Sequence, residues 1–576
     1  MKKKNTNKKF NQQKDLDSYI WNACDILRRS NCAGALQYVP EITWMLFLRI
    51  LDIREEEELE NSEAVGHHFE QSLKSPYRWR DWAATYDLEE IKQNKKADGW
   101  KRYELTEKGS RGDFITFINN KLLPYLKKLK DQPNASVRQK VISEIMTNVE
   151  KTRVDTERNL LDVLDKIHEI NPSEVDNTHI FTLSQVYEGL LLKMGEKGND
   201  GGQFFTPREV IRFIIKTIDP KPGEIIYDPC CGTGGFLAEG FNYINLKLDQ
   251  ESTEELENLK HNTFFGREKE NLIYPIALAN LILHGINEPH IWHGNTLSGE
   301  ETYSGLFQNA PSGYDVIVTN PPFGGKENKD VQSNFEFKTN ATQVLFLQHV
   351  IKSLKNGGRC GIVLDEGVLF RTNETAFFQT KEKLLDECKV FAIVSLPSGV
   401  FNSAGAGVKT NVLFFEKGSE TDKIWYYDLS DVKVGKKSPL TQKNFEEFFQ
   451  LLPKKGKSNN SWIIDFTTKK KKAKAEAEKL KKEAKKVELE IDEINSLLAL
   501  NKDGDEELEN RLMERTKEKR DLLKKAQNVE YGAYDLKAVN PNKKTEEDRR
   551  TPKELIEFLQ IKGKEVEDIL KKLSKS

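Results

Sequence analysis

Tyr314-Asp-Val-Ile-Val-Thr-Asn-Pro-Pro-Phe323 is a short apolar run that ends on an amide, two prolines and an aromatic ring. The β-branched residues at 316–318 are typical of a buried strand in a parallel sheet. Residues 320–323, called the ledge below, cannot continue that strand, because each proline lacks a backbone donor and fixes φ. Ligands bind beside the carboxyl ends of strands in open α/β sheets. The sequence therefore predicts a ligand site at the ledge.

The ledge also suits one reaction, methyl transfer to an exocyclic amine. The lone pair of an adenine N6 amine is delocalised into the ring, which makes the amine a poor nucleophile. The side-chain oxygen of Asn320 and the carbonyl of Pro321 can each accept one N–H and localise that lone pair, while Phe323 stacks on the base. An ordinary strand-to-loop turn is the alternative, because paired prolines end strands in many proteins. The tetrapeptide, which includes Pro322, resembles the catalytic motif of amino-group DNA methyltransferases.

Composition limits the classes of protein that fit. A chain of 576 residues suggests several domains, and a net charge of −2 leaves nucleic-acid affinity to local basic patches or to a partner. No apolar run of about 18 residues predicts a membrane span, and the basic N-terminus lacks the apolar core of a signal peptide. The cysteines lack paired C-x-x-C spacing, which favours free thiols in a reducing cytoplasm over a zinc site or disulfides. They are Cys24, Cys32, Cys230, Cys231, Cys360 and Cys388.

The N-terminal third of the chain has helical periodicity. Residues 1–14 form a lysine- and asparagine-rich tail that we expect to be disordered, and residues 15–170 are expected to form a helical domain. Two aromatic clusters within it, at 77–82 and 100–103, could contact DNA. Packing in a core is the more common use of such residues, and it is the interpretation we favour.

A glycine-led segment comes next, at residues 201–209. Its Thr206-Pro-Arg-Glu209 fits a capping box with proline at the first helical position, opening a helix over residues 210–218. An ordinary helix start explains the cap but not Gln203, Phe204 and Phe205 just before it. We expect these side chains to wall a flat ligand.

Residues 224–237 have the order strand, acid, glycine loop and helix. Gly232, Gly234 and Gly235 allow the backbone to turn sharply and approach a ligand closely. The loop has neither a G-x-G-x-x-G fingerprint nor a G-K-[ST] phosphate loop, which argues against dinucleotides and nucleoside triphosphates. Asp228 at the strand end suits a ligand with positive charge, such as an amino-acid ammonium. These features point to S-adenosylmethionine.

Further strands and helices alternate up to about residue 465. A strand at 263–266 leads to Glu268, the position where a doubly wound fold binds ribose hydroxyls, and a solvated charge is the alternative reading. Asn295 follows a short third strand and either bonds an adenine edge or holds a turn. A helix is expected at 342–354, with strands at 358–364, 390–396 and, as the last one, 410–415. This alternation predicts a mostly parallel sheet in an α/β domain over residues 185–465.

The remainder is lysine-rich and helical. Apolar residues recur at 480, 484, 487, 491, 494 and 498, which is a heptad seam. A turn at 501–505 and a return helix predict an antiparallel helical hairpin over residues 469–527. Residues 528–576 form a helical tail whose apolar stripe, which includes Leu555, Leu559 and Val566, predicts a role in subunit assembly.

Taken in chain order, these features resemble the modification (M) subunit of type I restriction–modification DNA methyltransferases. The resemblance rests on residues 203–208, 228–235, 266–268, 280–285 and 320–323, and on the helical segments at both ends. It implies an S-adenosylmethionine-dependent, Rossmann-like α/β sheet, flanked by a helical N-terminal domain and a coiled-coil C-terminal tail. It implies that the ledge holds a flipped adenine. It also implies cofactor contacts from Gln203, Phe204, Phe205, Thr206, Pro207, Arg208, Thr233, Gly234, Gly235 and Glu268.

The resemblance also implies partners. They are double-stranded DNA, a specificity (S) subunit that reads the target, a second M subunit and a restriction (R) subunit. The segment after residue 465 is helical and lacks a globular domain of the size needed to read DNA, which agrees with a separate specificity subunit. Two alternatives stay open at this point. One is a self-sufficient DNA adenine methyltransferase, and the other is a scaffold subunit without catalysis.

Overall fold

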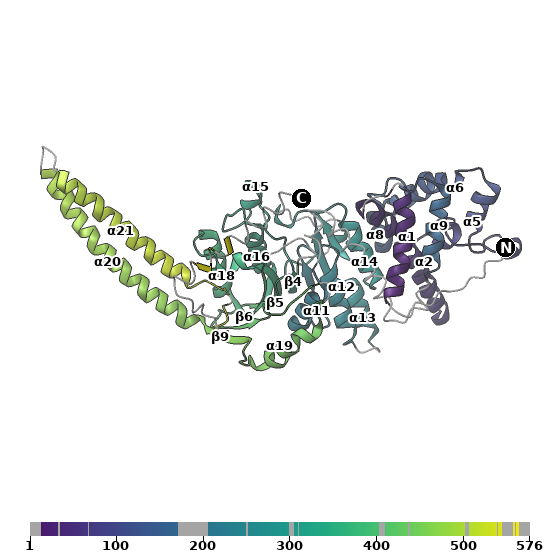
Figure 1. The fold of residues 1–576 in the computed structure, drawn as a ribbon. Helices are drawn as coiled ribbons and strands as arrows, with labels where there is room; N and C mark the ends of the chain where they lie inside the picture. The colour runs from purple at the N-terminus through teal and green to yellow at the C-terminus, as the bar shows by residue number, and fades with distance from the viewer. Residues whose placement is uncertain are drawn as a thin grey trace.

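The computed structural model describes residues 13–170 except 31, 33, 34 and 67, residues 206–298 except 249–251, and residues 305–401 except 309. It also describes residues 409–543 except 436, 437, 501–505 and 538, and five positions between 557 and 563. Within these residues the molecule is elongated (Figure 1). A helical N-terminal part lies at one end, a sheet covered by helices lies in the middle, and a long helical hairpin projects from the other end.

The N-terminal part is an all-helical bundle around buried aromatic rings. Trp79 and Trp82 are fully buried, and the Trp82 ring lies 6.5 Å from that of Trp44. The prediction that these aromatics pack in the core is confirmed for both residues. The helices are α1 (Gln13–Arg29), α2 (Ala35–Val65), α3 (Trp79–Trp82), α4 (Leu88–Gln93), α5 (Trp100–Tyr103), α6 (Asp113–Phe117), α7 (Leu123–Lys127), α8 (Val137–Met146) and α9 (Glu157–His168).

The described residues form one nine-stranded sheet, with the order β3-β2-β1-β4-β5-β7-β6-β8-β9. Strands β7 and β9 run antiparallel to their neighbours, and the other pairings are parallel. The strands are β1 (Ile226–Asp228), β2 (Phe264–Glu268), β3 (His290–His293), β4 (Tyr314–Thr319), β5 (Leu354–Asp365), β6 (Cys388–Ser395), β7 (Thr410–Lys417), β8 (Lys423–Asp428) and β9 (Ser461–Asp465). This is the mostly parallel α/β sheet that the sequence predicted.

The prediction that residues 410–415 form the last strand was wrong. Strands β8 and β9 follow it, and β8 pairs parallel with β6, with Ala392 opposite Trp425. The aromatic run Trp425-Tyr-Tyr427 has the composition of a strand. Its place beside an earlier strand depends on long-range pairing, and so does the antiparallel pairing of β9 with β8.

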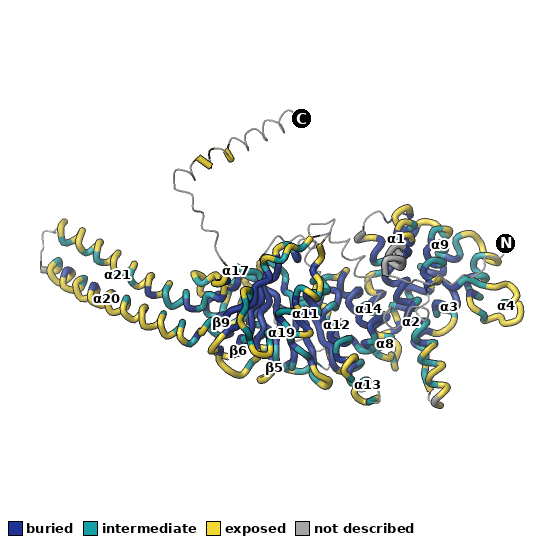
Figure 2. The backbone as a smooth tube through the Cα atoms, turned by 60° about the horizontal axis from the view of Figure 1, so that its bottom comes forward, coloured by how far each residue is buried: buried dark blue, intermediate teal, exposed yellow. Residues whose placement is uncertain are grey.

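Helices cover both faces of the sheet, which places its apolar residues in two separate cores. Val316 and Val318 of β4 belong to the core on the side of α11 (Arg208–Ile218), α12 (Gly235–Asn245) and α14 (Tyr274–Leu283). Ile317, between them, belongs to the core on the side of α16 (Thr342–Ser353) and α18 (Thr375–Glu387). Figure 2 shows the strands of the sheet as a dark blue, buried layer in the middle of the molecule. The remaining helices of this part are α13 (Thr253–His261), α15 (Lys329–Gln332), α17 (Glu366–Phe370) and α19 (Glu446–Leu451).

The N-terminal part docks on α14 of the sheet domain, through α2 and α8. The guanidinium of Arg54, on α2, donates hydrogen bonds to the carbonyls of Ile282 and Leu283. These are the last two residues of α14, where helical carbonyls run out of partners within the helix, and the Ile282 carbonyl also accepts the Gly285 amide at 3.0 Å. A side chain of one domain therefore completes a helix of the other.

The hairpin consists of α20 (Phe466–Leu500) and α21 (Glu506–Gly532), as the sequence predicted for this region. Seam residues Ala484, Val487 and Ile494 are buried between the two helices, and Ala526 of α21 is buried as well. Ion pairs join the helices on the outside, including Lys519 to Glu488 at 2.7 Å.

Past the hairpin, Leu536 donates its amide to the carbonyl of Leu369 at 3.1 Å, which returns the chain to the sheet domain. Leu555, Leu559 and Val566 of the expected C-terminal stripe, and most of the N-terminal tail, lie outside the described residues. No helix of the described part is long and apolar enough to span a bilayer.

Candidate active site

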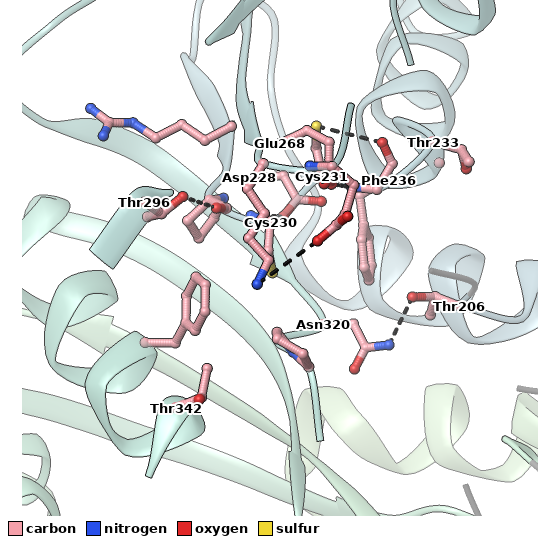
Figure 3. A pocket seen from close by; sticks show the side chains of 18 of the residues that line it. Thr206, Asp228, Cys230, Cys231, Thr233, Phe236, Glu268, Thr296, Asn320 and Thr342 are labelled. Atoms are coloured by element: carbon pink, nitrogen blue, oxygen red, sulfur yellow. Dashed lines mark hydrogen bonds and ion pairs between the residues drawn. The ribbon is translucent and has the colours of Figure 1, made fainter. Parts of the chain in front are cut away.

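Strand order brings the two sequence motifs together at one edge of the sheet. β1 and β4 are neighbours, with Tyr227 opposite Ile317, so the loop after Asp228 and the ledge after Thr319 leave the sheet side by side. A pocket opens between them (Figure 3). Of the residues expected to bind ligands, those that line it are Thr206, Pro207, Arg208, Asp228, Gly232, Thr233, Gly235, Glu268, Asn295, Asn320 and Pro322. Gly234, Pro321 and Phe323 do not line it, and Gln203, Phe204 and Phe205 lie outside the described residues.

The glycine loop is a turn that other residues cannot replace without strain. Gly232 and Gly234 have φ of +55° and +80°, in the left-handed region. Gly235 is the first residue of α12, and a Cβ there would lie 2.9 Å from Cδ1 of Ile211. The loop therefore lies tightly against α11, with its backbone forming part of the pocket wall.

Two buried carboxyls lie at the ends of β1 and β2. Asp228 accepts hydrogen bonds from the Thr319 hydroxyl at 2.7 Å and the Cys230 amide at 3.1 Å. Glu268 accepts from the amides of Gly232 at 2.9 Å and Glu270 at 2.8 Å. Burial nevertheless raises the pKa of both carboxyls to about 7, because the hydrogen bonds offset only part of the desolvation. A positive group that entered the pocket would favour the ionised forms.

The Asn320 amide of the ledge is held by Thr206, two residues before α11. Asn320 Nδ2 donates to the Thr206 hydroxyl at 3.0 Å, as Figure 3 shows. Asn320 Oδ1 is buried and has no hydrogen-bond partner in the described part of the chain. An unpaired buried acceptor is costly, so this oxygen fits a ligand donor that completes it.

The capping-box prediction for residues 206–209 was wrong. Helix α11 begins at Arg208, its N-cap is Pro207, and no side chain caps it. Thr206 therefore lies one residue too early to cap the helix, and its hydroxyl contacts Asn320 instead. The hydroxyl joins the two motifs across the pocket.

The rest of the ledge is anchored behind the pocket. The Pro321 carbonyl accepts a hydrogen bond from Gln343 Nε2 at 3.2 Å. The half-buried Phe323 ring packs edge-on against Phe401, with ring centroids 5.4 Å apart. Both residues thus lie beside the pocket wall and not in it.

Of the two roles that the sequence left open for Asn295, the structure contains the turn. Its Oδ1 accepts the amide of Leu297 at 3.0 Å and so holds a turn, while the residue also lines the pocket. The amide nitrogen remains available to a ligand edge.

Several lining residues were not found from the sequence. They include Phe236, Arg267, Thr296, Glu327, Thr342 and Phe346. Phe236 follows the glycine loop directly, so its position was a usable signal. Thr342 and Phe346 belong to α16, a buried helix without a motif, and only the fold brings them to the ledge.

These residues fit S-adenosylmethionine. Asp228 can receive an ammonium, Glu268 can accept ribose hydroxyls, and the glycine loop leaves room for a ligand against the backbone. Asn320 lines the same pocket and carries the orphaned oxygen, which suits a second, amine-bearing ligand next to the cofactor.

Known proteins share this organisation. A family model described as N-6 DNA methylase matches residues 178–496, and one described as the HsdM N-terminal domain matches residues 16–167. The type I restriction enzyme EcoEI methylase subunit of Escherichia coli is 36% identical over 419 residues, which cover 72% of this chain and 77% of that protein. The chain belongs to the type I restriction enzyme methylase subunits. This methylase subunit is thus a DNA methyltransferase for adenine N6 that uses S-adenosylmethionine.

Solved structures agree with the assignment. A modification subunit of a type I restriction enzyme from Vibrio vulnificus YJ016 is 32% identical with a TM-score of 0.67, and the match covers 80% of the methylase subunit and 94% of that chain. A chain from a structure of type I restriction–modification complex assembly is 32% identical with a TM-score of 0.63, and the match covers 98% of each chain. The second match is long enough to include the hairpin α20–α21. The family resemblance inferred from the sequence is therefore confirmed.

Proposed function

We propose that the ledge and the two carboxyls carry the reaction of this methylase subunit, as the modification subunit of a type I restriction–modification complex. The unpaired Asn320 oxygen is the observation that supports this most directly. Asn320, which carries this acceptor, lines the pocket together with Asp228 and Glu268, so an amine and a cofactor would meet there.

Asn320 and Pro321 act on the target amine. Asn320 Oδ1 accepts one N–H of the adenine N6 amine, and the Pro321 carbonyl accepts the other, which localises the nitrogen lone pair. Phe323 stacks on the base, and Pro322 keeps the ledge rigid because its φ is fixed. Bound S-adenosylmethionine supplies the electrophilic methyl group.

Several groups around the pocket hold the cofactor. Asp228 binds the ammonium and Glu268 the ribose hydroxyls, while Gly232, Thr233, Gly234 and Gly235 provide the close backbone approach. Thr206 and Pro207 before α11, and Arg208 at its start, contact the cofactor, and Gln203, Phe204 and Phe205 would wall its flat part. Asn295 contacts the adenine edge through its amide nitrogen.

A separate specificity subunit reads the DNA target. A base inside a duplex must be flipped out for methylation, which costs a few kcal/mol. A net charge of −2 gives this chain little general affinity for phosphate, so DNA binding depends on local basic patches or on a partner. We propose a complex with a specificity subunit, a second copy of the methylase subunit and a restriction subunit, located in the cytoplasm.

We propose the following division of the chain. Residues 15–170 are a helical domain, residues 185–465 the catalytic domain, residues 469–527 the hairpin and residues 528–576 an assembly tail. Residues 1–14 are a basic tail outside these units. The close packing of α14 against α2 and α8 supports a catalytic domain that works together with the helical one.

The experiment is co-expression with and without the specificity subunit, followed by mass spectrometry of nucleosides from the modified DNA. We expect N6-methyladenine at specific sites only when both subunits are present. Site-specific methylation by the chain alone would favour a self-sufficient enzyme. N4-methylcytosine without N6-methyladenine would refute the base assignment. Calorimetry that detects no S-adenosylmethionine binding, with or without the partner, would leave only a scaffold role.

A further inference from the structure

Gln343 connects the ledge to the neighbouring strand from behind the pocket. It is the second residue of α16 and only 3% exposed. Its Nε2 donates to the Pro321 carbonyl at 3.2 Å, and its Oε1 accepts the Asp365 amide at 3.0 Å. Thr342, just before it, lines the pocket in Figure 3, whereas Gln343 itself does not.

The two contacts fix the orientation of the Gln343 amide without ambiguity. A backbone carbonyl can only accept and a backbone N–H can only donate, so Nε2 must face Pro321 and Oε1 must face Asp365. Asp365 is itself fixed, because it caps α17 by accepting the Val368 amide at 3.0 Å. Gln343 therefore bridges two points of the backbone that are both rigid.

The peptide that joins Pro321 to Pro322 has no N–H, so its oxygen is its sole hydrogen-bonding atom. A hydrogen bond can hold the plane of this peptide only through that oxygen, and Gln343 Nε2 provides one. A carbonyl oxygen has two lone pairs, and the Gln343 bond occupies one of them. No hydrogen bond in the described part of the chain occupies the other, so it can accept a donor of a bound base.

We propose that Gln343 is a positioning residue for methyl transfer. It sets the direction of the Pro321 carbonyl, and thereby the angle at which the target amine is held. The proposal rests on the proposed function, in which this carbonyl accepts an N–H of adenine. Gln343 acts through Pro321 and does not touch the base.

The chain provides a matched control five positions further along α16. Gln348 is 7% exposed, donates to the Phe337 carbonyl at 2.9 Å and accepts the Phe337 amide at 3.0 Å. It makes the same pair of backbone contacts from the same helix, but to a loop and not to the ledge. If the substitutions merely destabilise the fold, the variants of both glutamines should lose activity to the same extent.

The test compares Gln343→Met, Gln343→Glu, Gln348→Met and Gln348→Glu with the wild type, each co-expressed with the specificity subunit. The readouts are kcat, KM for DNA, the dissociation constant for S-adenosylmethionine and Tm. For Gln343→Met we expect kcat to fall about tenfold to a hundredfold, the range expected when a reacting group is misplaced. Cofactor affinity should stay within about twofold, because Gln343 lies outside the pocket.

The isosteric Gln343→Glu supplies a pH signature. A neutral carboxylic acid can donate to Pro321 and accept from Asp365, whereas a carboxylate repels the Pro321 carbonyl. Burial raises the pKa of such a carboxyl, so kcat relative to wild type should recover as the pH falls from 9 to 6. Gln343→Met and both Gln348 variants should show no such recovery.

Two results would overturn the proposal. One is a Gln343→Met variant whose kcat equals that of the wild type. The other is a Gln348→Met variant that loses as much kcat as Gln343→Met, with the loss of kcat in both variants proportional to the fall in Tm. A wild-type complex that binds cofactor but forms no N6-methyladenine would refute the proposed function instead, and the Gln343 proposal with it. Wild-type activity with an unaffected Gln343→Met would refute the Gln343 proposal alone.

Discussion

The Thr319 hydroxyl donates to Asp228 Oδ1 at 2.7 Å and so joins the residue before the ledge to the carboxyl at the end of the neighbouring strand. Thr319 is fully buried, and its hydroxyl stabilises the ionised form of Asp228. The proposed cofactor site and the proposed base site are thus connected through this hydrogen bond.

Replacing that hydroxyl should weaken cofactor binding in a pH-dependent way. Thr319→Val keeps the shape but removes a hydrogen bond to a carboxylate, so the pKa of Asp228 rises further above its usual range. We expect S-adenosylmethionine affinity to fall about tenfold at pH 7 and to recover towards pH 9, where the carboxyl ionises regardless. Isothermal titration at both pH values measures this, and an equal loss at both would contradict it.

Removing the unpaired oxygen should separate catalysis from cofactor binding. Asn320→Ala deletes the acceptor for the target amine, whose contacts form mainly in the transition state. We expect turnover to fall by about 10² to 10³-fold, as when a preorganised stabilising group is lost, with cofactor affinity nearly unchanged. Methylation assays and calorimetry on the same preparation test it. A parallel loss of cofactor binding would show that Asn320 acts on the cofactor.

The two buried carboxyls should make the response to cofactor depend on pH. Their folded pKa of about 7 lies above the usual value of about 4. Between these values the folded chain binds more protons than the unfolded chain, so their contribution to stability falls as the pH rises from about 4 to 7. A cofactor ammonium favours the ionised forms and offsets this cost. The rise in Tm with S-adenosylmethionine should therefore be larger at pH 8 than at pH 6.

Scanning fluorimetry at pH 6, 7 and 8, with and without cofactor, measures that difference. Asp228→Asn serves as the control variant, in which the pH dependence should flatten because one of the two carboxyls is gone. An equal rise in Tm with cofactor at all three pH values would mean that both carboxyls are ionised over this whole pH range.

The contact between the domains should contribute to stability without affecting the site. Arg54→Met leaves the carbonyls of Ile282 and Leu283 without that donor, at a cost of about 1–3 kcal/mol. We expect a lower Tm and unchanged cofactor affinity. Arg111→Met, at an exposed position, should change stability by less than about 0.5 kcal/mol. Equal Tm values for the two variants would show that the Arg54 contacts are dispensable.

The motifs of the site were predictable because each depends on local backbone chemistry. A strand ending on Asp228, a left-handed glycine turn and a proline-terminated strand are visible in short windows of sequence. The strand order that places these windows side by side then follows from the doubly wound pattern. The heptad seam of α20 was predictable for the same reason, because the spacing of its apolar residues is visible within a single helix.

Features that depend on long-range contacts were missed. Thr206 has the sequence of a cap, yet its hydroxyl contacts Asn320, 114 positions away. Gln343 lies in a helix that is buried nearly throughout, so no polar pattern marks it, and its partner is 22 positions away. Local propensity does not encode such pairings. Only the packing of α16 and the ledge at one sheet edge produces them.

Strand β7 separates β5 from β6, although it follows both in the chain. During synthesis β5 therefore has an open edge until residue 417 has left the ribosome, because the strand that belongs there has not yet been made. The strands that carry the pocket, β1 to β4, are already made by then, together with the whole of α16 and β5. A nascent chain can thus fold β1 to β5 first. Until β7 is made, the edge of β5 stays unpaired and is prone to aggregation.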